Sequence, residues 1–513
     1  MVYIKSNPNQ TTLIPTDIKT IISKDHMCYL TENIIDQLDF SEYDKQVDGA
    51  GNPSYHPKIN LKIIIQGICD RVTSTRKLEQ LTNESVVYMY LSEGLHPNFH
   101  TIAMFRKNNH DIIKECFLQT INVAKNLNMI NLNKLYLDGI KIKANASKCK
   151  TFTKEEVEFL SQFVDDHLEK MNITDNEEDE QFGDTSGEPK IPEYLSSKKK
   201  LQEKIKEILK DIPKSKQQLD IANNKIKSEN INKINFTDID SKLLKMKKGI
   251  HFEQAYNCQL LVEDKGELIV GNYISDSACD NNETIPTMEK FKAEQNVSLK
   301  NIEIFQDNGY SNIKTFEYYE KENVIPYIPD SVTTKELHGK AYKITKFNND
   351  NFSLDFKKNQ ATCPNGEIMK FYKKEFRDKA RRRWTNVYKT KKCKLCKSKT
   401  ECIKKGATYR EAKINPLQRK IRLRFKTKSG IKKYNKRFHK GEIAQAHIEH
   451  NLGYREFKCR GKKSCQNEVN LFSIAYNLKK IHNKLKKNQK QTLCLMKKIF
   501  LENKLFLDFN IAI

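Results

Sequence analysis

The chain has 513 residues, of which 91 are lysine or arginine and 65 are acidic, so its net charge is +26 at pH 7. A chain of this length divides into several domains, and a basic surplus of this size is typical of proteins that bind a polyanion. No apolar run approaches the roughly 18–20 residues that span a bilayer, which favours nucleic acid over a membrane as the partner.

The cysteines and the first residues predict the compartment. The 13 cysteines are odd in number and mostly scattered, which is typical of a reducing environment. The first ten residues, MVYIKSNPNQ, are polar and do not resemble a secretory signal. We therefore expect a cytoplasmic, nucleoid-associated protein. Asparagine, isoleucine and lysine abound throughout, and such a compositional bias raises the net charge by itself. The charge therefore counts for about half of its usual weight as an indication of nucleic-acid binding.

Residues 1–128 are predicted to form an all-α domain. Helices are expected to begin near Pro15, at Pro57 and near His100, and the last of these continues to about Asn126.

A basic helix in this domain is a candidate for DNA contact. The helix that begins at Pro57 ends near Val72, and Ser74 can cap the next helix, which carries Arg76 and Lys77. Two helices joined by a short turn have the outline of a helix-turn-helix, so Arg76 and Lys77 are predicted to contact DNA. An ordinary helical hairpin fits the same pattern.

A strongly β-prone stretch follows at 135–148, LYLDGIKIKANASK. Asp138 lies near its start, and the next residues alternate apolar and basic, as in a half-buried strand. Lys141 and Lys143 would give this strand a basic rim for DNA phosphate. The alternative is a surface aspartate that opens a turn with Gly139.

The segment 151–236 is dense in charge and is predicted to be a solvated insertion. It contains four consecutive acids at 177–180 and a Lys/Glu-rich helix from about Ser196 that breaks at Pro213. Consecutive acids repel each other and stay hydrated, so we do not expect them to be catalytic.

Strands return after the insertion. Residues 255–263 and 267–275 predict a hairpin, and 301–306 and 324–328 predict two short strands with helices before and after Asp307. Asp307 follows the strand 301–306 directly, and α/β sheets place functional side chains at such strand ends.

The segment 331–425 is strongly basic and contains Cys363, Cys393, Cys396 and Cys402. The Cys393–Cys396 spacing suits a zinc knuckle, so a four-cysteine Zn²⁺ site is one reading and free thiols are the other. Arg381, Arg382 and Arg383 precede the only tryptophan, Trp384, and this basic-aromatic group suits backbone contact and base stacking. A solvated charge run is the alternative.

A late helix, predicted over 431–453, carries Glu442 and Glu449 on one face. A first strand, a hairpin and then strand-helix units follow the ribonuclease-H-like order, in which three acids from distant segments converge. Carboxylates at such a site suit two Mg²⁺ ions, which promote in-line phosphoryl transfer. The predicted fold class is therefore α/β, with a ribonuclease-H-like mixed-sheet core, an all-α N-terminal domain and a basic, cysteine-containing insertion.

Several motifs support a family resemblance in the right order along the chain. They are LIPTDI, YHPK with RKLEQL, FHTIAMFRK, LYLDGIKIKANASK, FQDNGYSN, KRFHKGEIAQAHIEHNLGYREFKCRG and LFSIAYNLKK. Over nearly its whole length the chain resembles bacterial insertion-sequence transposases of the DDE class, of the IS4-like group. The resemblance implies that Asp138, Asp307 and Glu442 bind Mg²⁺ or Mn²⁺ and that the enzyme cuts element ends and joins a 3′-hydroxyl to target DNA.

The signature of these relatives is matched incompletely. Some members carry a Tyr-Arg-Glu-Lys signature. Its first three residues correspond here to Tyr434, Arg437 and Glu442, and Arg437 lies one residue further from the glutamate than is common. The expected lysine is replaced by Glu449, which is therefore an alternative third acid. Tyr434 and Arg437 are expected to contact DNA.

The resemblance also implies double-stranded DNA as the partner and a homodimer on DNA. A catalytically inert DNA-binding repressor is the alternative function, and a nuclease without transfer activity is a third. The predicted divisions are 1–128, 129–330 with the insertion 151–236, 331–425, 426–487 and a tail at 488–513.

Overall fold

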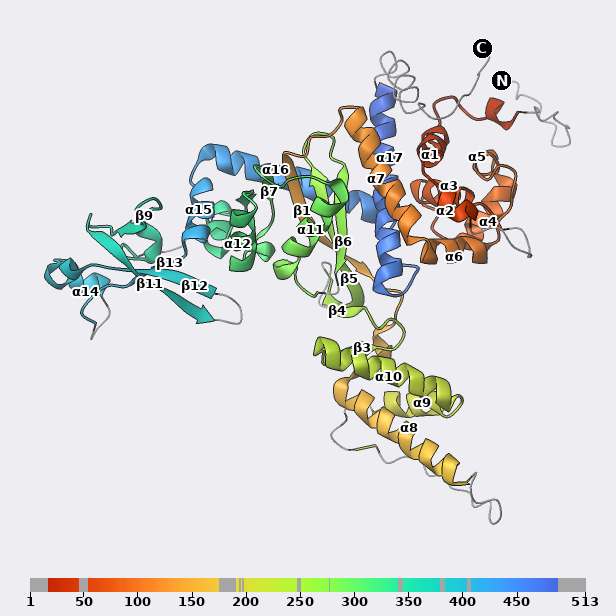
Figure 1. The fold of residues 1–513 in the computed structure, drawn as a ribbon, viewed down its shortest axis with the longest axis horizontal. Coiled ribbons are helices and arrows are strands. Elements are labelled where there is room, and N and C mark those ends of the chain that lie inside the picture. The colour runs from red at the N-terminus through yellow and green to blue at the C-terminus, as the bar shows by residue number, and fades with distance from the viewer. Residues whose placement is uncertain are drawn as a thin grey trace, which may run out of the picture.

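We analysed a computed structural model of the chain. The structure describes residues 17–45, 54–174, 191–192, 195, 198–246, 251–275, 277–339, 345–378, 383–403 and 407–487. Figure 1 shows a central sheet with helices around it, a group of N-terminal helices on one side and two inserted units that project away from the sheet.

The N-terminal part is helical, as predicted. After a single 3-10 turn at Ile18–Thr20, its helices are α1 (Met27–Ile35), α2 (Ser41–Lys45), α3 (Pro57–Cys69), α4 (Thr75–Glu84), α5 (Val86–Leu91), α6 (Phe99–Asn108) and α7 (His110–Asn126). Two predictions were wrong in detail. The helix expected near Pro15 is only the 3-10 turn, and the long helix expected to Asn126 breaks at Asn109. The Asn109 amide donates to the Phe105 carbonyl at 3.1 Å, a local bond that competes with the helical pattern.

The central sheet is mixed. Its strands are β1 (Lys134–Lys143), β4 (Lys242–Lys245), β5 (Phe252–Glu263), β6 (Ile269–Ser275), β7 (Glu303–Phe305) and β8 (Ile325–Tyr327). Strand β5 pairs antiparallel with β1, β4 and β6, whereas β7 runs parallel to both β1 and β8. The predicted first strand, hairpin and two short strands are all present at the expected positions.

Long helices cover this sheet. The segment around the late acids forms α16 (Lys428–Ala446), which continues into a π-helical turn, η7 (His447–Asn451), and α17 (Lys462–Lys487) follows. Helices α11 (Thr284–Gln295), α12 (Ile313–Lys321) and α15 (Pro416–Arg424) complete the cover. Helix α17 lies against α7, α3 and β6 and so connects the N-terminal helices to the sheet.

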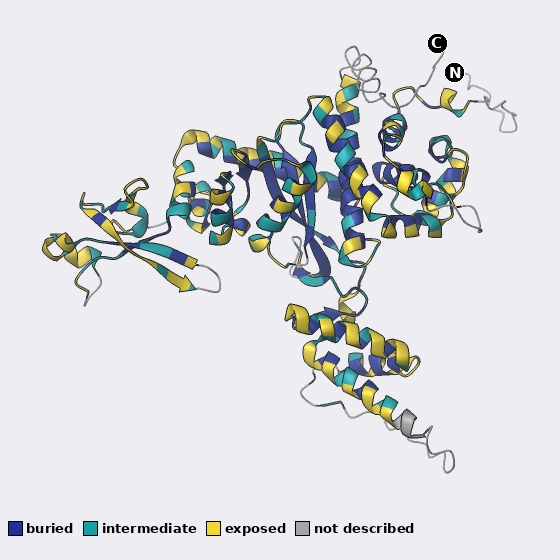
Figure 2. Cartoon of the chain, in the orientation of Figure 1, coloured by how far each residue is buried: buried dark blue, intermediate teal, exposed yellow. Residues whose placement is uncertain are grey.

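One apolar core extends through the N-terminal helices and the central sheet. It contains Ile64 of α3, Phe117 of α7, Leu137 of β1 and Phe472 of α17, all almost fully buried. Figure 2 shows this continuous buried interior, whereas the two projecting units are largely exposed. The N-terminal helices are therefore packed onto the sheet and share its hydrophobic stabilisation.

The first inserted unit is a small helical module. It consists of β2 (Thr151–Thr153), α8 (Lys154–Thr174), α9 (Lys198–Ile208), α10 (Ile212–Glu229) and β3 (Lys233–Asn235). An apolar cluster of its own includes Leu160, Ile205 and Ala222, so a merely solvated insertion is not what the structure shows. Pro213 lies in the first turn of α10, where its missing N–H is tolerated, and the acids at 177–180 lie outside the described residues.

The second inserted unit contains a five-stranded antiparallel sheet that the sequence analysis did not predict. Its elements are α13 (Ser331–Leu337), β9 (Ser353–Asp355), β10 (Gln360–Thr362), β11 (Ile368–Asp378), β12 (Arg383–Lys389), η6 (Lys391–Leu395), α14 (Lys399–Cys402) and β13 (Ala412–Ile414). The strand order is β13-β12-β11-β10-β9, over a small core that includes Phe352 and Tyr388. In the described part of the chain, no helix combines the length and apolarity needed to cross a membrane.

Candidate active site at the ends of strands β1 and β7

Two of the predicted acids leave the sheet side by side. In the parallel pair of β1 and β7, Tyr136 lies opposite Phe305, a separation of 169 residues (305 − 136). Asp138 and Asp307 have the same separation (307 − 138 = 169), so each acid lies two positions beyond that pair. Because β7 ends at Phe305, the two strands diverge there and Asp307 begins the short turn η4 (Asn308–Tyr310).

Local hydrogen bonds orient both carboxylates. Asp138 Oδ1 accepts a hydrogen bond from the backbone N–H of Gly139 at 3.0 Å. Asp307 Oδ1 accepts one from the backbone N–H of Gly309 at 2.7 Å, as the N-cap of η4. Each acid is thus held by the glycine in its own motif.

Helix α16 brings the third predicted acid to this place. Arg437 Nη1 lies 3.2 Å from Asp138 Oδ2, and Arg437 Nη2 lies 3.9 Å from Glu442 Oε1. Gly441 lies at this contact, since a Cβ atom there would lie 3.7 Å from the Asp138 Cβ, an ordinary packing distance. Asp138 and Arg437 are buried, whereas the Glu442 side chain is 53% exposed and faces solvent beside them. Glu442 is therefore joined to Asp138 through Arg437.

The alternative third acid lies further along. Glu449 is half-buried on η7, beyond Gln445, whose amide donates to the Gly139 carbonyl at 3.3 Å. The arginine-mediated link to Asp138 thus favours Glu442.

The charges of the site act on each other. Burial would lower the pKa of Arg437, but the nearby Asp138 and Asp307 carboxylates outweigh it and raise that pKa above its usual value. Burial raises the pKa of Tyr434, and the same two acids add to the increase. Tyr434 and Arg437 therefore belong to the acid cluster. In the described residues, Arg437 pairs with acids, so the predicted contact of Arg437 with DNA would compete with these ion pairs.

Sequence reasoning missed one acid at this place. Asp280 begins the short turn η3 (Asp280–Asn282), and its carboxylate lies next to Gly139 and Gly309. The motif SDSACDNNE gave one signal, an acid close after the hairpin strand β6. Only the tertiary fold shows that this turn lies against the loops that carry Asp138 and Asp307.

The remaining predicted DNA contacts are dispersed over the molecule. Arg76 and Lys77 are exposed on α4, with Arg76 packed on the Phe99 ring at 4.3 Å. On β1, Lys141 donates to the Lys245 carbonyl at 2.9 Å, and Lys143 is half-buried.

The basic-aromatic group differs from its prediction. Trp384 is only 6% exposed, and its indole N–H donates to Glu317 Oε1 at 2.8 Å. A buried ring with an occupied N–H is not open to a nucleotide base, so the expected stacking by Trp384 was wrong. Arg383 is exposed, whereas Arg381 and Arg382 lie outside the described residues.

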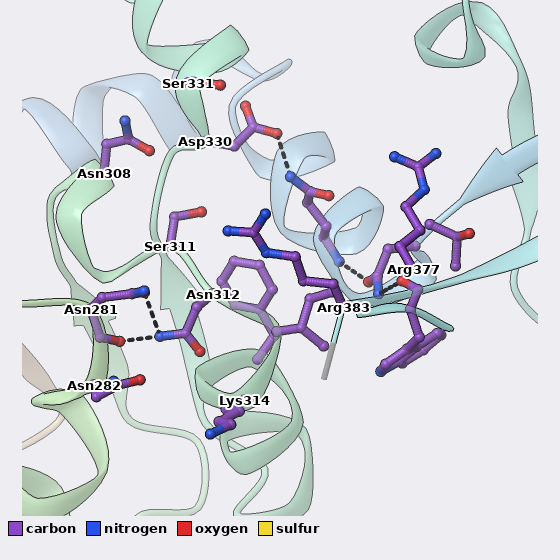
Figure 3. A pocket seen from close by; sticks show the side chains of 16 residues that line it. Asn281, Asn282, Asn308, Ser311, Asn312, Lys314, Asp330, Ser331, Arg377 and Arg383 are labelled. Carbon is purple, nitrogen blue, oxygen red and sulfur yellow. Dashed lines mark hydrogen bonds between the residues drawn. The ribbon is translucent and has the colours of Figure 1, made fainter. Parts of the chain in front are cut away.

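A polar groove of about 730 Å³ lies between the acid-bearing loops and the second inserted unit (Figure 3). It begins at Asn308 and Asn281, which follow Asp307 and Asp280 directly, and it reaches Arg377 and Arg383 on the far wall. Asn312 Nδ2 donates to Asn281 Oδ1 at 2.8 Å, so the two near loops are joined. Neither arginine has an ion-pair partner among the residues that the structure describes. Amide groups and two available guanidinium groups suit a phosphodiester chain.

The four grouped cysteines lie around one small cavity. Cys363, Cys393, Cys396 and Cys402 line an apolar cavity of about 30 Å³. Burial raises the pKa of Cys402, and the other three thiols add to the increase, which places the four sulfurs in one neighbourhood. All are free thiols. Within the described residues, no three His, Cys, Asp or Glu side chains stand close enough to hold a metal ion as placed.

Comparison with known proteins gives two matches. Residues 362–482 match a family model described as a transposase DDE domain, and residues 16–108 match one described as a transposase domain (DUF772). The first match includes the cysteine group, α16 and α17, and the second covers the helices α1 to α6. A search of curated proteins found no match.

Proposed function

We propose that this chain, whose two family matches are both to transposase domains, is an insertion-sequence transposase of the DDE class that binds the terminal inverted repeats of its element, cleaves DNA with Mg²⁺ and joins the freed 3′-hydroxyl to target DNA. One observation carries this proposal. Asp138 and Asp307 leave neighbouring parallel strands together, and Arg437 joins Glu442 to them.

The order of the central sheet supports a ribonuclease-H-like core. Strand β1 lies between the antiparallel hairpin β5–β6 and the parallel strands β7 and β8, which is the order predicted for that fold. In this arrangement the first acid lies on the central strand, the second at the end of β7 and the third on the late helix α16. The transposase domain match supports the class but is not specific to the IS4-like group, which stays a prediction.

The chemistry of the donor set suits a divalent metal ion, which would have to draw the three acids together, because in the described residues they do not stand close enough to hold one. Transposases of this class use divalent metal ions, and three carboxylates are the hard oxygen ligands that Mg²⁺ and Mn²⁺ prefer. Asp138, Asp307 and Glu442 would hold the metal, which supplies charge stabilisation for the attacking and leaving oxygens. Arg437 partly neutralises Asp138 and keeps its carboxylate oriented toward α16.

DNA would lie across the acids and the adjacent groove. The net charge of +26 favours a polyanion, and the groove gives amide and guanidinium groups that suit phosphates beside the cut. Arg76 and Lys77 on the exposed face of α4 would contact the element end. Because two ends must be cut together, we expect a homodimer on DNA.

The test uses a duplex that carries an element end. With Mg²⁺ or Mn²⁺, the wild-type protein should nick, cut and join this DNA, and without metal it should only bind. Asp138→Asn should abolish all products while leaving end binding within about twofold, because binding rests on phosphate contacts elsewhere. Strand transfer by Asp138→Asn in Mg²⁺ would overturn the assignment. Binding without any metal-dependent product from the wild-type protein would support the inert repressor instead.

A structural Zn²⁺ site at Cys363, Cys393, Cys396 and Cys402 is part of the proposal. Its support is the shared small cavity and the thiol chemistry of the donor set. Zinc would stabilise a unit whose own apolar core is small. The purified protein should contain one zinc per chain, and Cys393→Ser should lose it. A zinc-free protein with four titratable thiols and unchanged stability would refute the site.

A further inference from the structure

Asp280, the acid that sequence reasoning missed, is hydrogen-bonded to β5, the first strand of the β5–β6 hairpin. Its Oδ1 accepts hydrogen bonds from Asn257 Nδ2 at 2.7 Å and from Gln259 Nε2 at 2.9 Å. Both amide side chains belong to β5 and are almost fully buried. One carboxylate oxygen thus satisfies two buried donors, whose loss would be costly.

The same carboxylate lies between the loops that carry the two strand-end acids. A Cβ atom on Gly139, next to Asp138, would lie 2.6 Å from Asp280 Oδ1, closer than side chains pack. A Cβ atom on Gly309, two residues after Asp307, would lie 3.6 Å from Asp280 Oδ2. Gly139 is therefore required for the close approach of Asp280, and Gly309 presents its backbone to the other side of the carboxylate.

A buried layer extends these contacts beneath the site. The Tyr310 hydroxyl donates to Gln259 Oε1, so η4 and Asp280 share the same amide side chain. Tyr310 is fully buried. Burial raises its pKa well above the usual value, and Asp280, Asp138 and Asp307 add to the increase in that order. The charges of all three aspartates therefore act on one buried hydroxyl group.

We propose that Asp280 is a positioning residue of the metal site: it fixes the loops after Asp138 and Asp307 against β5, so that both carboxylates meet the same metal ions. This inference rests on the proposed function. Asp280 acts through its hydrogen bonds and close packing, whereas Asp138, Asp307 and Glu442 contact the metal. Outer contacts of this kind typically change metal affinity or activity by about 10–100-fold when they are removed.

Three substitutions at this position separate geometry from charge. Asp280→Asn removes the charge but can keep an oxygen at Oδ1, so both amide hydrogen bonds persist. Asp280→Ala removes both bonds. Asp280→Glu keeps the charge but lengthens the side chain by a methylene, which displaces the carboxylate from the Asn257 and Gln259 donors. Mn²⁺ binding to the protein–DNA complex is followed by electron paramagnetic resonance of free Mn²⁺, together with single-turnover cleavage.

We expect the half-saturating Mn²⁺ concentration to rise about tenfold or more in Asp280→Ala and Asp280→Glu, and to stay within about threefold in Asp280→Asn. Tyr319→Phe is the control for a lost buried hydrogen bond, because it removes the Tyr319–Gln306 bond of 2.9 Å, which shares no partner with Asp280. This control should lower thermal stability without changing Mn²⁺ binding.

Other outcomes overturn the inference. Equal losses of Mn²⁺ affinity in Asp280→Asn and Asp280→Ala would show that the charge of Asp280, and not its hydrogen bonds, supports metal binding. Unchanged Mn²⁺ binding in Asp280→Glu would exclude a positioning role. If Asp280→Ala does not fold, the comparison of Mn²⁺ binding by Asp280→Asn and Asp280→Glu still tests the positioning role. A wild-type protein that neither binds Mn²⁺ nor cleaves would refute the proposed function itself, which is a different result.

Discussion

At the scale of single residues, the proposal of Glu442 as the third acid rests on one contact. Glu442 is linked through Arg437 to Asp138, whereas Glu449 occupies the position of an expected lysine on η7. Two glutamates two turns apart on one helix face look alike in sequence, so a pattern cannot rank them. The contact of Glu442 with the buried Arg437 is the structural reason to prefer it.

Glu442→Gln should lower the single-turnover cleavage rate by about 100-fold or more, equivalent to about 3 kcal/mol of barrier, because it removes a metal ligand. Glu449→Gln should change the rate by less than about fivefold. Both variants should bind end DNA like the wild-type protein, which is measured by gel shift in the absence of metal. A large loss in Glu449→Gln with an active Glu442→Gln would identify Glu449 as the third acid.

Single residues also show where sequence reasoning ends. The positions of Asp138 and Asp307 at neighbouring strands were predictable because each stands in or just after a short β-prone run, one or two residues before a glycine, a local pattern. Asp280 was not, since its role depends on a turn that the fold brings against those glycines. Trp384 was misread because a tryptophan beside arginines suits DNA contact, but the partner of its N–H, Glu317, is 67 residues away.

At the scale of elements, the core strands were predictable and the second inserted unit was not. Strands β1, β5 and β6 are β-prone runs whose residues are mostly buried, with turn residues between β5 and β6. Strand β11 is almost entirely exposed and rich in lysine, so it carries no alternating apolar pattern. Its pairing with β12 comes from backbone bonds and register, which composition does not reveal.

The second inserted unit is attached to the core through a buried ion pair. Asp330 precedes α13 and pairs with Arg422 of α15, and both side chains are mostly buried. Burial raises the pKa of Asp330, but the charge of Arg422 and hydrogen bonds from Arg422 and Thr333 outweigh it, so the pKa is lowered from 3.8. The ionised carboxylate is therefore favoured in the folded protein.

Asp330→Asn should lower the free energy of unfolding by about 3 kcal/mol at pH 7, because Arg422 loses a buried partner. The ionised form is more stable in the folded state, so this contribution is complete above pH 3.8 and disappears as the pH falls through the lowered value. Urea unfolding at several pH values measures it. Glu320→Gln, from an exposed pair with Lys420, should cost less than about 1 kcal/mol at every pH. If the difference in free energy of unfolding between the wild-type protein and Asp330→Asn stayed constant down to pH 3, the ion pair would not be its cause.

The groove between the acid loops and β11–β12 makes a prediction about DNA contact. The double variant Arg377→Ala/Arg383→Ala should weaken end binding about tenfold and reduce the slope of log affinity against log salt by about 2, since two phosphate contacts are lost. Lys216→Ala on α10, an exposed lysine outside the groove, is the control and should change neither value. An unchanged salt slope in the double variant would exclude phosphate contact by these arginines.

At the scale of the whole molecule, one core carries the three proposed metal-binding acids and two units are inserted into it. The sequence indicated the inserted segments by charge, because charge-dense stretches interrupt the apolar patterns of the core. It did not indicate that the helical unit has a core of its own, since the members of that core come from three helices and two short strands separated along the chain. Nor did it indicate that α17 would join the N-terminal helices to the sheet, where Asn477 bonds both Thr120 and the backbone of Ile269.

The helical unit is inserted at a point where its two ends meet. Strands β2 and β3 pair antiparallel, with Thr153 opposite Lys233, so the chain leaves the core and returns at adjacent positions. Replacing residues 154–232 by Asn-Gly would close this pair as a two-residue hairpin. Contacts that are lost include the Lys225–Asp240 and Lys242–Glu229 ion pairs, which are partly exposed and contribute little each.

The shortened protein should therefore fold, with a fall in the midpoint of thermal unfolding of no more than about 5 °C. It should also retain metal-dependent cleavage of an end-containing duplex, because Asp138, Asp307 and Glu442 all lie outside the deleted segment. Calorimetry and the cleavage assay measure the two properties independently. Aggregation or a much larger fall in the midpoint would show that the helical unit stabilises the core, whereas a stable but inactive protein would show that the unit takes part in DNA binding or end pairing.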